Sequence, residues 1–159
     1  VNTVKDAKKA IESSYYYPQG KRGVGLSIAS NFGYNFKNYI QNISKKIPLI
    51  LQIESIEGIN NLEKILDLKN INGTLLGPYD LSSSLGVIGK LESPLVKKAI
   101  RKYENISKKK RVPMGIHITE PNVIKIKNYK KRNYKFVASG TDALFLGNSC
   151  RDFLKKLSI

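Results

Sequence analysis

The chain has 159 residues, a single cysteine and a formal net charge of +16. The single cysteine excludes an internal disulfide and a zinc site built on several thiolates, and no apolar run approaches the roughly 20 residues that span a bilayer. We therefore expect one cytoplasmic domain without a membrane partner, whose basic surface leaves a nucleic-acid-binding module as one alternative function.

The first third of the chain is predicted to contain two helices and a loop. Residues 4–14 have helical character, with Thr3 as the expected N-cap and Asp6 in the first turn. Proline and glycine residues in the segment 17–25 are typical of turns, and a second helix is expected over residues 34–45.

The rest of the chain alternates short apolar runs with amphipathic stretches. The apolar runs predict strands at residues 48–53, 71–76, 112–118, 134–138 and 142–146. Helical spacing of apolar residues, supported by cap residues and prolines at helix starts, predicts helices at residues 57–69, 93–109, 120–131 and 149–158. This alternation predicts a parallel sheet covered by helices, which is either a small open α/β sheet or the later part of a barrel.

Two carboxylates directly follow predicted strands. Glu54 comes immediately after the strand at 48–53, and Asp80 follows the strand at 71–76 by a Gly-Pro turn. Functional groups of parallel α/β folds gather at the carboxyl ends of strands, and hard oxygen ligands of this kind suit Mg²⁺ or Mn²⁺. The structural alternatives are a helix cap or turn for Asp80 and a solvated or dipole-compensating carboxylate for Glu54.

Four segments, taken in chain order, resemble motifs of the HpcH/HpaI aldolase family. Residues 16–25 (YYPQGKRGVG) resemble its YPPxGxRGxG loop, and residues 52–54 (QIE), followed by Gly58, resemble its metal-binding strand. Residues 77–86 (GPYDLSSSLG) closely resemble its GPxDLSxSxG signature, and residues 139–142 (SGTD) resemble its final strand region. Together the matches cover nearly the whole chain.

This resemblance implies the later strands of a (β/α)₈ TIM barrel, with residues 1–159 forming a single C-terminal portion. It also implies a metal-dependent class II aldolase, a carbon–carbon lyase of the 2,4-dihydroxyhept-2-ene-1,7-dioate or 2-dehydro-3-deoxyglucarate type. Such an enzyme reversibly cleaves a 4-hydroxy-2-oxo acid to pyruvate, or a related 2-oxo acid, plus an aldehyde. The implied cofactor is Mg²⁺, Mn²⁺ or Co²⁺, and the implied assembly is a homo-oligomer.

Site residues follow from the same resemblance, position by position. Glu54 and Asp80 would be the metal ligands, and Gln52 would line the pyruvate site. The backbone amides of Tyr79 and Asp80 would hold the pyruvate carboxylate. A bound metal would stabilise the negative charge that develops on cleavage, so no Schiff-base lysine is required.

The departures from the family pattern concern the catalytic base. The family's histidine base and substrate-stabilising arginine lie in earlier strands that have no counterpart here. His117, the one histidine, lies near the end of the strand predicted at 112–118 and is a candidate catalytic residue, with a hydrogen-bonded structural role as its alternative. Arg22 matches the family's loop arginine, and we expect it to anchor the loop. An alternative function is therefore a truncated or split aldolase-like chain that acts only with a partner.

Overall fold

Four parallel strands form one sheet in the computed structural model, which describes residues 1–157. The strands are β1 (Ile50–Ile53), β2 (Gly73–Leu76), β3 (Met114–Ile118) and β4 (Phe136–Ser139). Their order in the sheet follows their order in the chain, and each neighbouring pair is parallel. This is the arrangement of consecutive strands in a β/α barrel, and it confirms the predicted parallel sheet.

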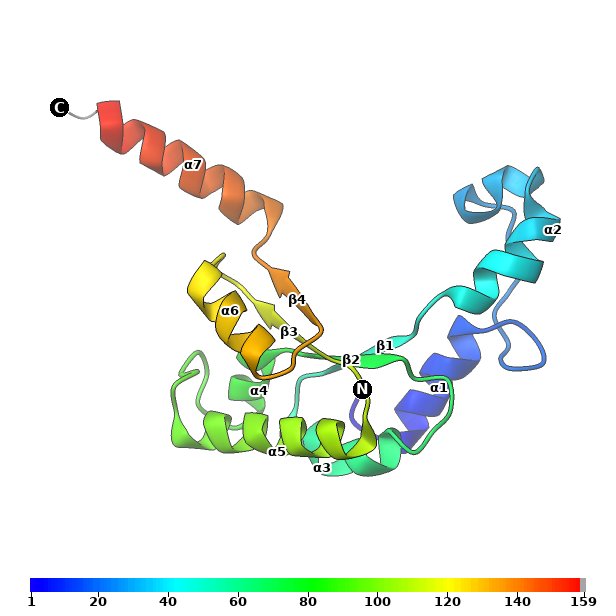
Figure 1. The fold of residues 1–159 in the computed structure, drawn as a ribbon, viewed down its shortest axis with the longest axis horizontal. Coiled ribbons are helices and arrows are strands. Elements are labelled where there is room, and N and C mark those ends of the chain that lie inside the picture. The colour runs from blue at the N-terminus through cyan, green and yellow to red at the C-terminus, as the bar shows by residue number, and fades with distance from the viewer. Residues whose placement is uncertain (158–159) are drawn as a thin grey trace.

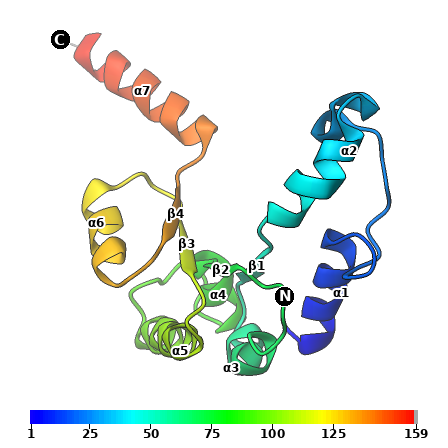
Figure 2. The same ribbon diagram turned by 45° about the vertical axis from the view of Figure 1, so that its right-hand side comes forward.

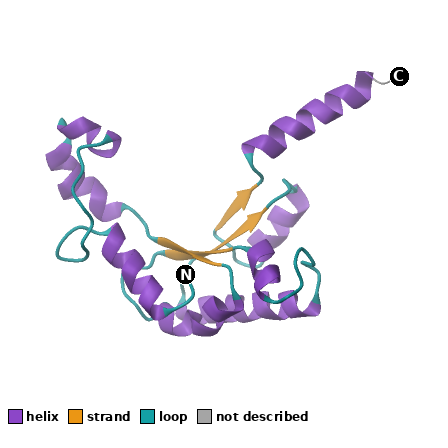
Figure 3. Ribbon diagram, turned by 180° about the vertical axis from the view of Figure 1, so that it is seen from behind, coloured by secondary structure: helices purple, strands orange, loops and turns teal. Residues whose placement is uncertain are grey.

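Helices connect the strands and extend beyond them. They are α1 (Val4–Ser14), α2 (Phe36–Asn38), α3 (Ile56–Ile65), α4 (Pro78–Ser84), α5 (Pro94–Lys110), α6 (Val123–Lys131) and α7 (Asp142–Leu157). A π-helical turn and a 3-10 turn continue α2 as far as Lys46, so the helix expected over residues 34–45 is present in irregular form. Helices α3 and α5 lie along one side of the sheet, whereas α2 and α7 extend away from it (Figure 1, Figure 3). No helix within residues 1–157 is long and apolar enough to cross a membrane.

The hydrophobic core lies between the sheet and helices α3 and α5. Ile53, Leu76 and Ile116 point into it from three neighbouring strands, and Leu62 and Tyr103 meet them from the helices. Successive strand residues point to opposite faces, so the residues between these core positions point the other way. Figure 2 shows this second face without a covering helix. We name it the open face and define it by Ile50, Gln52, Leu75, His117, Phe136 and Ala138.

One buried hydroxyl ties the two central strands together. The hydroxyl of Tyr103, on α5, lies 2.8 Å from the hydroxyl of Thr74 on β2. It also lies within hydrogen-bonding distance of the carbonyl oxygens of Thr74 and of Gly115 on β3, at 3.2 and 3.4 Å. A helix residue thus holds β2 and β3 in register beneath the ends of these strands.

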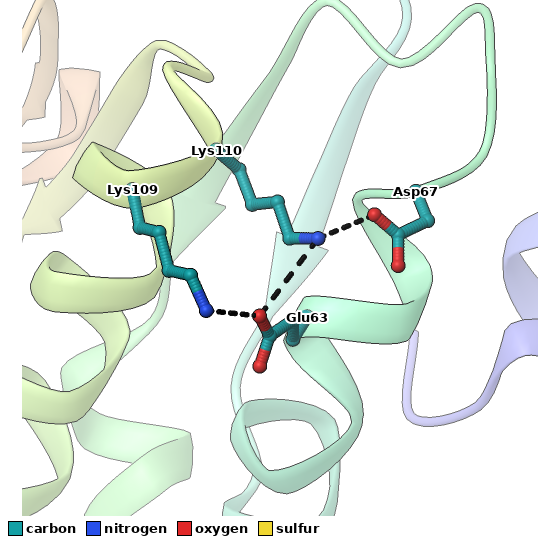
Figure 4. Close-up of polar contacts among 4 residues, drawn as sticks. All are labelled: Glu63, Asp67, Lys109 and Lys110. Carbon is teal, nitrogen blue, oxygen red and sulfur yellow. Dashed lines mark hydrogen bonds and ion pairs between the residues drawn. The ribbon is translucent and has the colours of Figure 1, made fainter.

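Ion pairs join α3 to α5 on the outside of the molecule (Figure 4). Lys109 lies 2.8 Å from a carboxylate oxygen of Glu63, and Lys110 lies 3.8 Å from the same oxygen. Lys110 also pairs with Asp67, just beyond the end of α3. The hydrogen bond from Lys109 holds the pKa of Glu63 below its usual range, with the nearby positive charge as a second cause.

The strand predicted at residues 142–146 is contradicted by the structure. Residues 142–146, predicted as a strand, form the first turns of α7, so the helix expected over 149–158 begins seven residues earlier. Gly140 takes a positive φ and turns the chain out of β4, after which the Thr141 hydroxyl accepts a hydrogen bond from the Leu144 amide and starts the helix. A short apolar run such as ALFL does not distinguish a strand from a helix by itself. Residue 158 of the expected helix lies outside the described residues.

Candidate functional site

The two carboxylates identified in the sequence lie at the carboxyl ends of neighbouring strands. Glu54 is the first residue after β1, and Asp80 lies in the first turn of α4, which begins directly after β2. Ile53 pairs with Leu76 in the sheet, so Glu54 lies beside Gly77, the residue that precedes α4. Asp80 is therefore neither the N-cap nor a loop residue, because Gly77 occupies the N-cap position.

Gly77 marks the point on which the two carboxylates converge. A β-carbon placed on this glycine would lie 3.5 Å from Glu54 Oε2 and 3.5 Å from Asp80 Oδ2. The two oxygens therefore face the same small space. Because each lies 3.5 Å from the same point, their separation is at most twice 3.5 Å. The same β-carbon would lie 3.2 Å from Glu54 Cβ, a tight contact, so glycine keeps this space open.

Gln52 orients one of the two carboxylates. Its Nε2 atom donates a hydrogen bond of 2.7 Å to Glu54 Oε2, and both residues belong to the same stretch of chain, two positions apart. Because side chains two residues apart on a strand share a face, this amide and this carboxylate point to the open face together. The hydrogen bond restricts Glu54 Oε2 to the side of Gly77.

The first turn of α4 presents backbone donors next to Asp80. Pro78 occupies the first helical position, and the first amide bonded within the helix is that of Leu81, which donates to the carbonyl of Gly77. The amides of Tyr79 and Asp80 thus have no intrahelical acceptor, as is general for the first turn of a helix. Tyr79 itself is 48% exposed.

The oxygen ligands present suit a hard divalent cation. Two carboxylates that share one space are the donors Mg²⁺ and Mn²⁺ take, with water or substrate oxygens in the remaining positions. Within residues 1–157 no group of three or more histidine, cysteine, aspartate or glutamate side chains could hold a metal ion. The donor set therefore fits a cation that keeps an open coordination sphere, and it does not fit a closed structural site.

Arg22 lies elsewhere and has a local role. Its guanidinium carbon is 4.9 Å from the centre of the Tyr16 ring, in the arrangement of a cation–π contact. This contact is in keeping with the loop-anchoring role predicted for it.

A cavity of about 550 Å³ adjoins the site and was not foreseen from the sequence. Tyr79 and His117 line it at the sheet end, and α5 and α6 form its sides. Arg132, the C-cap of α6, is one of its lining residues, and a guanidinium nitrogen of this side chain lies 2.7 Å from a carboxylate oxygen of the buried Glu104 on α5. No sequence motif marks this cavity, because it depends on how far apart two helices stand.

Comparison with known sequences identifies the family to which this chain belongs. The family model described as HpcH/HpaI aldolase/citrate lyase matches residues 1–149. The 5-keto-4-deoxy-D-glucarate aldolase of Klebsiella pneumoniae is 34% identical over 142 residues, which are 89% of this chain and 55% of that protein. The chain thus spans about half the length of the curated relatives it matches.

Solved structures give the same result for the fold. An HpcH/HpaI aldolase/citrate lyase family protein from Burkholderia cenocepacia covers 100% of this chain with a TM-score of 0.89 and 26% identity, over 63% of its own chain. The HpcH/HpaI aldolase from Desulfitobacterium hafniense covers 100% of this chain with a TM-score of 0.83 and 25% identity, over 62% of its own chain. The predicted partial barrel is therefore confirmed.

Proposed function

The chain belongs to the HpcH/HpaI aldolase/citrate lyase family, and from that premise we propose that it supplies the metal-binding half of an aldolase. The reaction is the reversible cleavage of a 4-hydroxy-2-oxo acid to pyruvate, or a related 2-oxo acid, and an aldehyde. Sugar-derived acids are the favoured substrate class, because a relative with 34% identity is named 5-keto-4-deoxy-D-glucarate aldolase.

The convergence of Glu54 and Asp80 on the space above Gly77 is the observation that carries this proposal. A divalent cation held there, with Mg²⁺, Mn²⁺ or Co²⁺ as candidates, would act as a Lewis acid toward the oxygens of a 2-oxo acid. Glu54 and Asp80 bind this cation, and Gln52 holds Glu54 Oε2 in the binding orientation through its hydrogen bond of 2.7 Å.

Binding and orientation of the substrate fall to neighbouring groups of the chain. The free amides of Tyr79 and Asp80 point from the start of α4 and bind the substrate carboxylate, since a helix start favours negative charge. Gln52, which contacts Glu54 on the open face, lines the proposed site of the 2-oxo acid. These contacts fix the 2-oxo acid before the carbon–carbon bond breaks, so that the charge that develops meets groups already in position.

We propose that the complete site includes further barrel strands beside the four described. The open face is uncovered, and neither β1 nor β4 has a neighbouring strand on its outer side within residues 1–157. Edges and apolar faces of this kind favour association, so we propose that the chain works as part of a larger assembly, either a homo-oligomer of a longer protein or a split enzyme with a partner. We propose the cytoplasm as its location.

Titration of the chain with Mn²⁺, followed by electron paramagnetic resonance, tests the metal site directly. We expect Glu54→Gln and Asp80→Asn each to remove the tight binding event. Glu57→Gln is the matched control, because Glu57 is an exposed carboxylate three residues from Glu54, on the outer helix α3, and should bind Mn²⁺ like the parent chain.

A coupled assay that detects pyruvate release from a 4-hydroxy-2-oxo acid then tests the reaction in the assembled enzyme. Loss of cleavage in the Glu54 and Asp80 variants, with full activity in the Glu57 control, is the expected result. If the Glu54 and Asp80 variants bind Mn²⁺ as tightly as the parent chain, the proposal is wrong.

A further inference from the structure

His117 lies in the same row of the sheet as the candidate metal site. Ile53 pairs with Leu76, and Leu76 pairs with Ile116, so the next position along each strand brings Glu54, Gly77 and His117 side by side. Met114 and Ile116 pack into the core, so His117, which alternates with them, points to the open face. The imidazole and the Glu54 carboxylate therefore share one face of the sheet, with a glycine between them.

The neighbours of His117 in this row leave space around the imidazole. Gly77 is on one side, and Ala138, its register partner on β4, is on the other. Neighbouring strands are roughly 4.8 Å apart, so His117 stands about one strand spacing from the space that Glu54 and Asp80 share above Gly77. A molecule bound at the two carboxylates and extending across the sheet meets the imidazole next.

The imidazole, which belongs to a residue lining the cavity next to the site, is not held in place by a polar contact within the described part of the chain. It is half-buried, and no hydrogen bond or ion pair of its side chain is found within residues 1–157. The open face below it carries apolar side chains such as Leu75 and Phe136. A polar group that is held at the rim of such a face, without an internal partner, is free to bind a ligand.

We propose that His117 is a specificity-determining residue that contacts the end of the substrate remote from the metal. This inference rests on the proposed function of Glu54 and Asp80. The imidazole donates a hydrogen bond to a carboxylate or hydroxyl oxygen at that end, so the site favours 2-oxo acids with a polar terminus over those with an alkyl terminus. His117 is thus assigned to substrate selection, a role separate from binding the cation.

The single histidine makes a direct test by proton NMR practicable, because every imidazole C–H signal of the chain comes from His117. Addition of Mn²⁺ should broaden both the His117 signal and the Gly77 amide signal, and Glu54→Gln should abolish both effects. Broadening of Gly77 alone would refute the role of His117 and leave the metal site intact. Broadening of neither signal would refute the proposed function. Broadening of His117 that persists in Glu54→Gln would mean that the imidazole binds Mn²⁺ by itself, which also refutes the inference.

Two acids of equal chain length test the selectivity. 2-Oxoglutarate ends in a carboxylate and 2-oxopentanoate ends in a methyl group, and their affinities are measured by calorimetry in the presence of Mg²⁺. We expect the ratio of the affinity for 2-oxoglutarate to the affinity for 2-oxopentanoate to be roughly tenfold larger in the parent chain than in His117→Leu. His117→Gln should retain most of this preference, because its amide still donates a hydrogen bond. Equal preference in the parent chain and in His117→Leu would overturn the proposal.

Discussion

Replacing Tyr103 by phenylalanine removes the hydroxyl that joins α5 to the two central strands. The ring is fully buried, and its hydroxyl lies 2.8 Å from the hydroxyl of Thr74. The substitution leaves the buried Thr74 hydroxyl without this partner. We expect the free energy of unfolding to fall by about 1–3 kcal/mol, the cost of one buried polar group that loses its hydrogen bond.

The reciprocal variant, Thr74→Val, should lower the free energy of unfolding by less, because the Tyr103 hydroxyl has further acceptors. In Thr74→Val the Tyr103 hydroxyl keeps two carbonyl acceptors, those of Thr74 and Gly115, at 3.2 and 3.4 Å. We expect a loss of about 0.5–1.5 kcal/mol. The double variant should cost less than the sum of the two, since no orphaned hydroxyl remains on either side.

The same hydroxyl also makes stability depend on pH in the alkaline range. Burial raises the pKa of Tyr103 from 10.0 to about 12. Because the folded-state pKa is raised, the stabilising effect of the neutral phenol is complete below pH 10 and is lost as the pH rises through 12. A shift of this size corresponds to about 2–3 kcal/mol, so the stability difference between the parent chain and Tyr103→Phe should shrink by that amount.

Urea unfolding followed by circular dichroism, at intervals from pH 8 upward, measures both effects. The difference between the two proteins isolates Tyr103, because the other tyrosines are common to both. Tyr134, whose pKa burial also raises, is among them. An unfolding difference that is near zero at pH 8, or that stays constant through the alkaline range, would refute the reasoning.

The other predictions concern the metal site and the ion pairs between α3 and α5. Gly77→Ala places a methyl group 3.5 Å from both carboxylate oxygens, so we expect Mn²⁺ affinity to fall by about 10–100-fold while the circular dichroism spectrum is retained. Gly25→Ala, where no atom lies within 4 Å of the added carbon, should bind like the parent chain, and unchanged binding in Gly77→Ala would contradict the site geometry. Glu63→Gln should lower the melting temperature at neutral pH, but the difference should vanish as the pH falls below the ordinary value of 4.5, because protonation of a carboxylate with a lowered pKa removes the same interaction in the parent chain. A melting difference that persists in acid, or that Glu57→Gln reproduces, would argue against this role.

Much of the fold was predictable because its signals are local. Apolar runs bounded by glycine and proline marked the strands, and Thr3, Ser93 and Pro94 marked helix starts that the structure retains. The run at 142–146 misled the prediction, because its apolar residues fit either a strand or a helix. The turn at Gly140 and the hydrogen bond from the Leu144 amide to the Thr141 hydroxyl start a helix at this point.

The candidate site was predictable in its residues and not in its geometry. The sequence alone identified Glu54 and Asp80, because both follow predicted strands and match family motifs. Gln52 and Tyr79 were identified from the family motifs only. No feature of the sequence singled out Gly77, whose missing side chain creates the space between the carboxylates. A glycine in a motif has several explanations, and the close approach of Glu54 becomes visible only when two strands are placed next to each other.

The amino-acid sequence by itself determined which family this chain resembles, which chemistry its carboxylates suit and that its strands are parallel. Tertiary structure alone decided that Glu54 and Asp80 face one point and that His117 shares their face of the sheet. The physical reason is that a side chain's direction depends on strand register. Register is set by interactions between residues far apart in the chain, such as the burial of Ile53 and Leu62 in one core cluster and the contact of Tyr103 with Thr74.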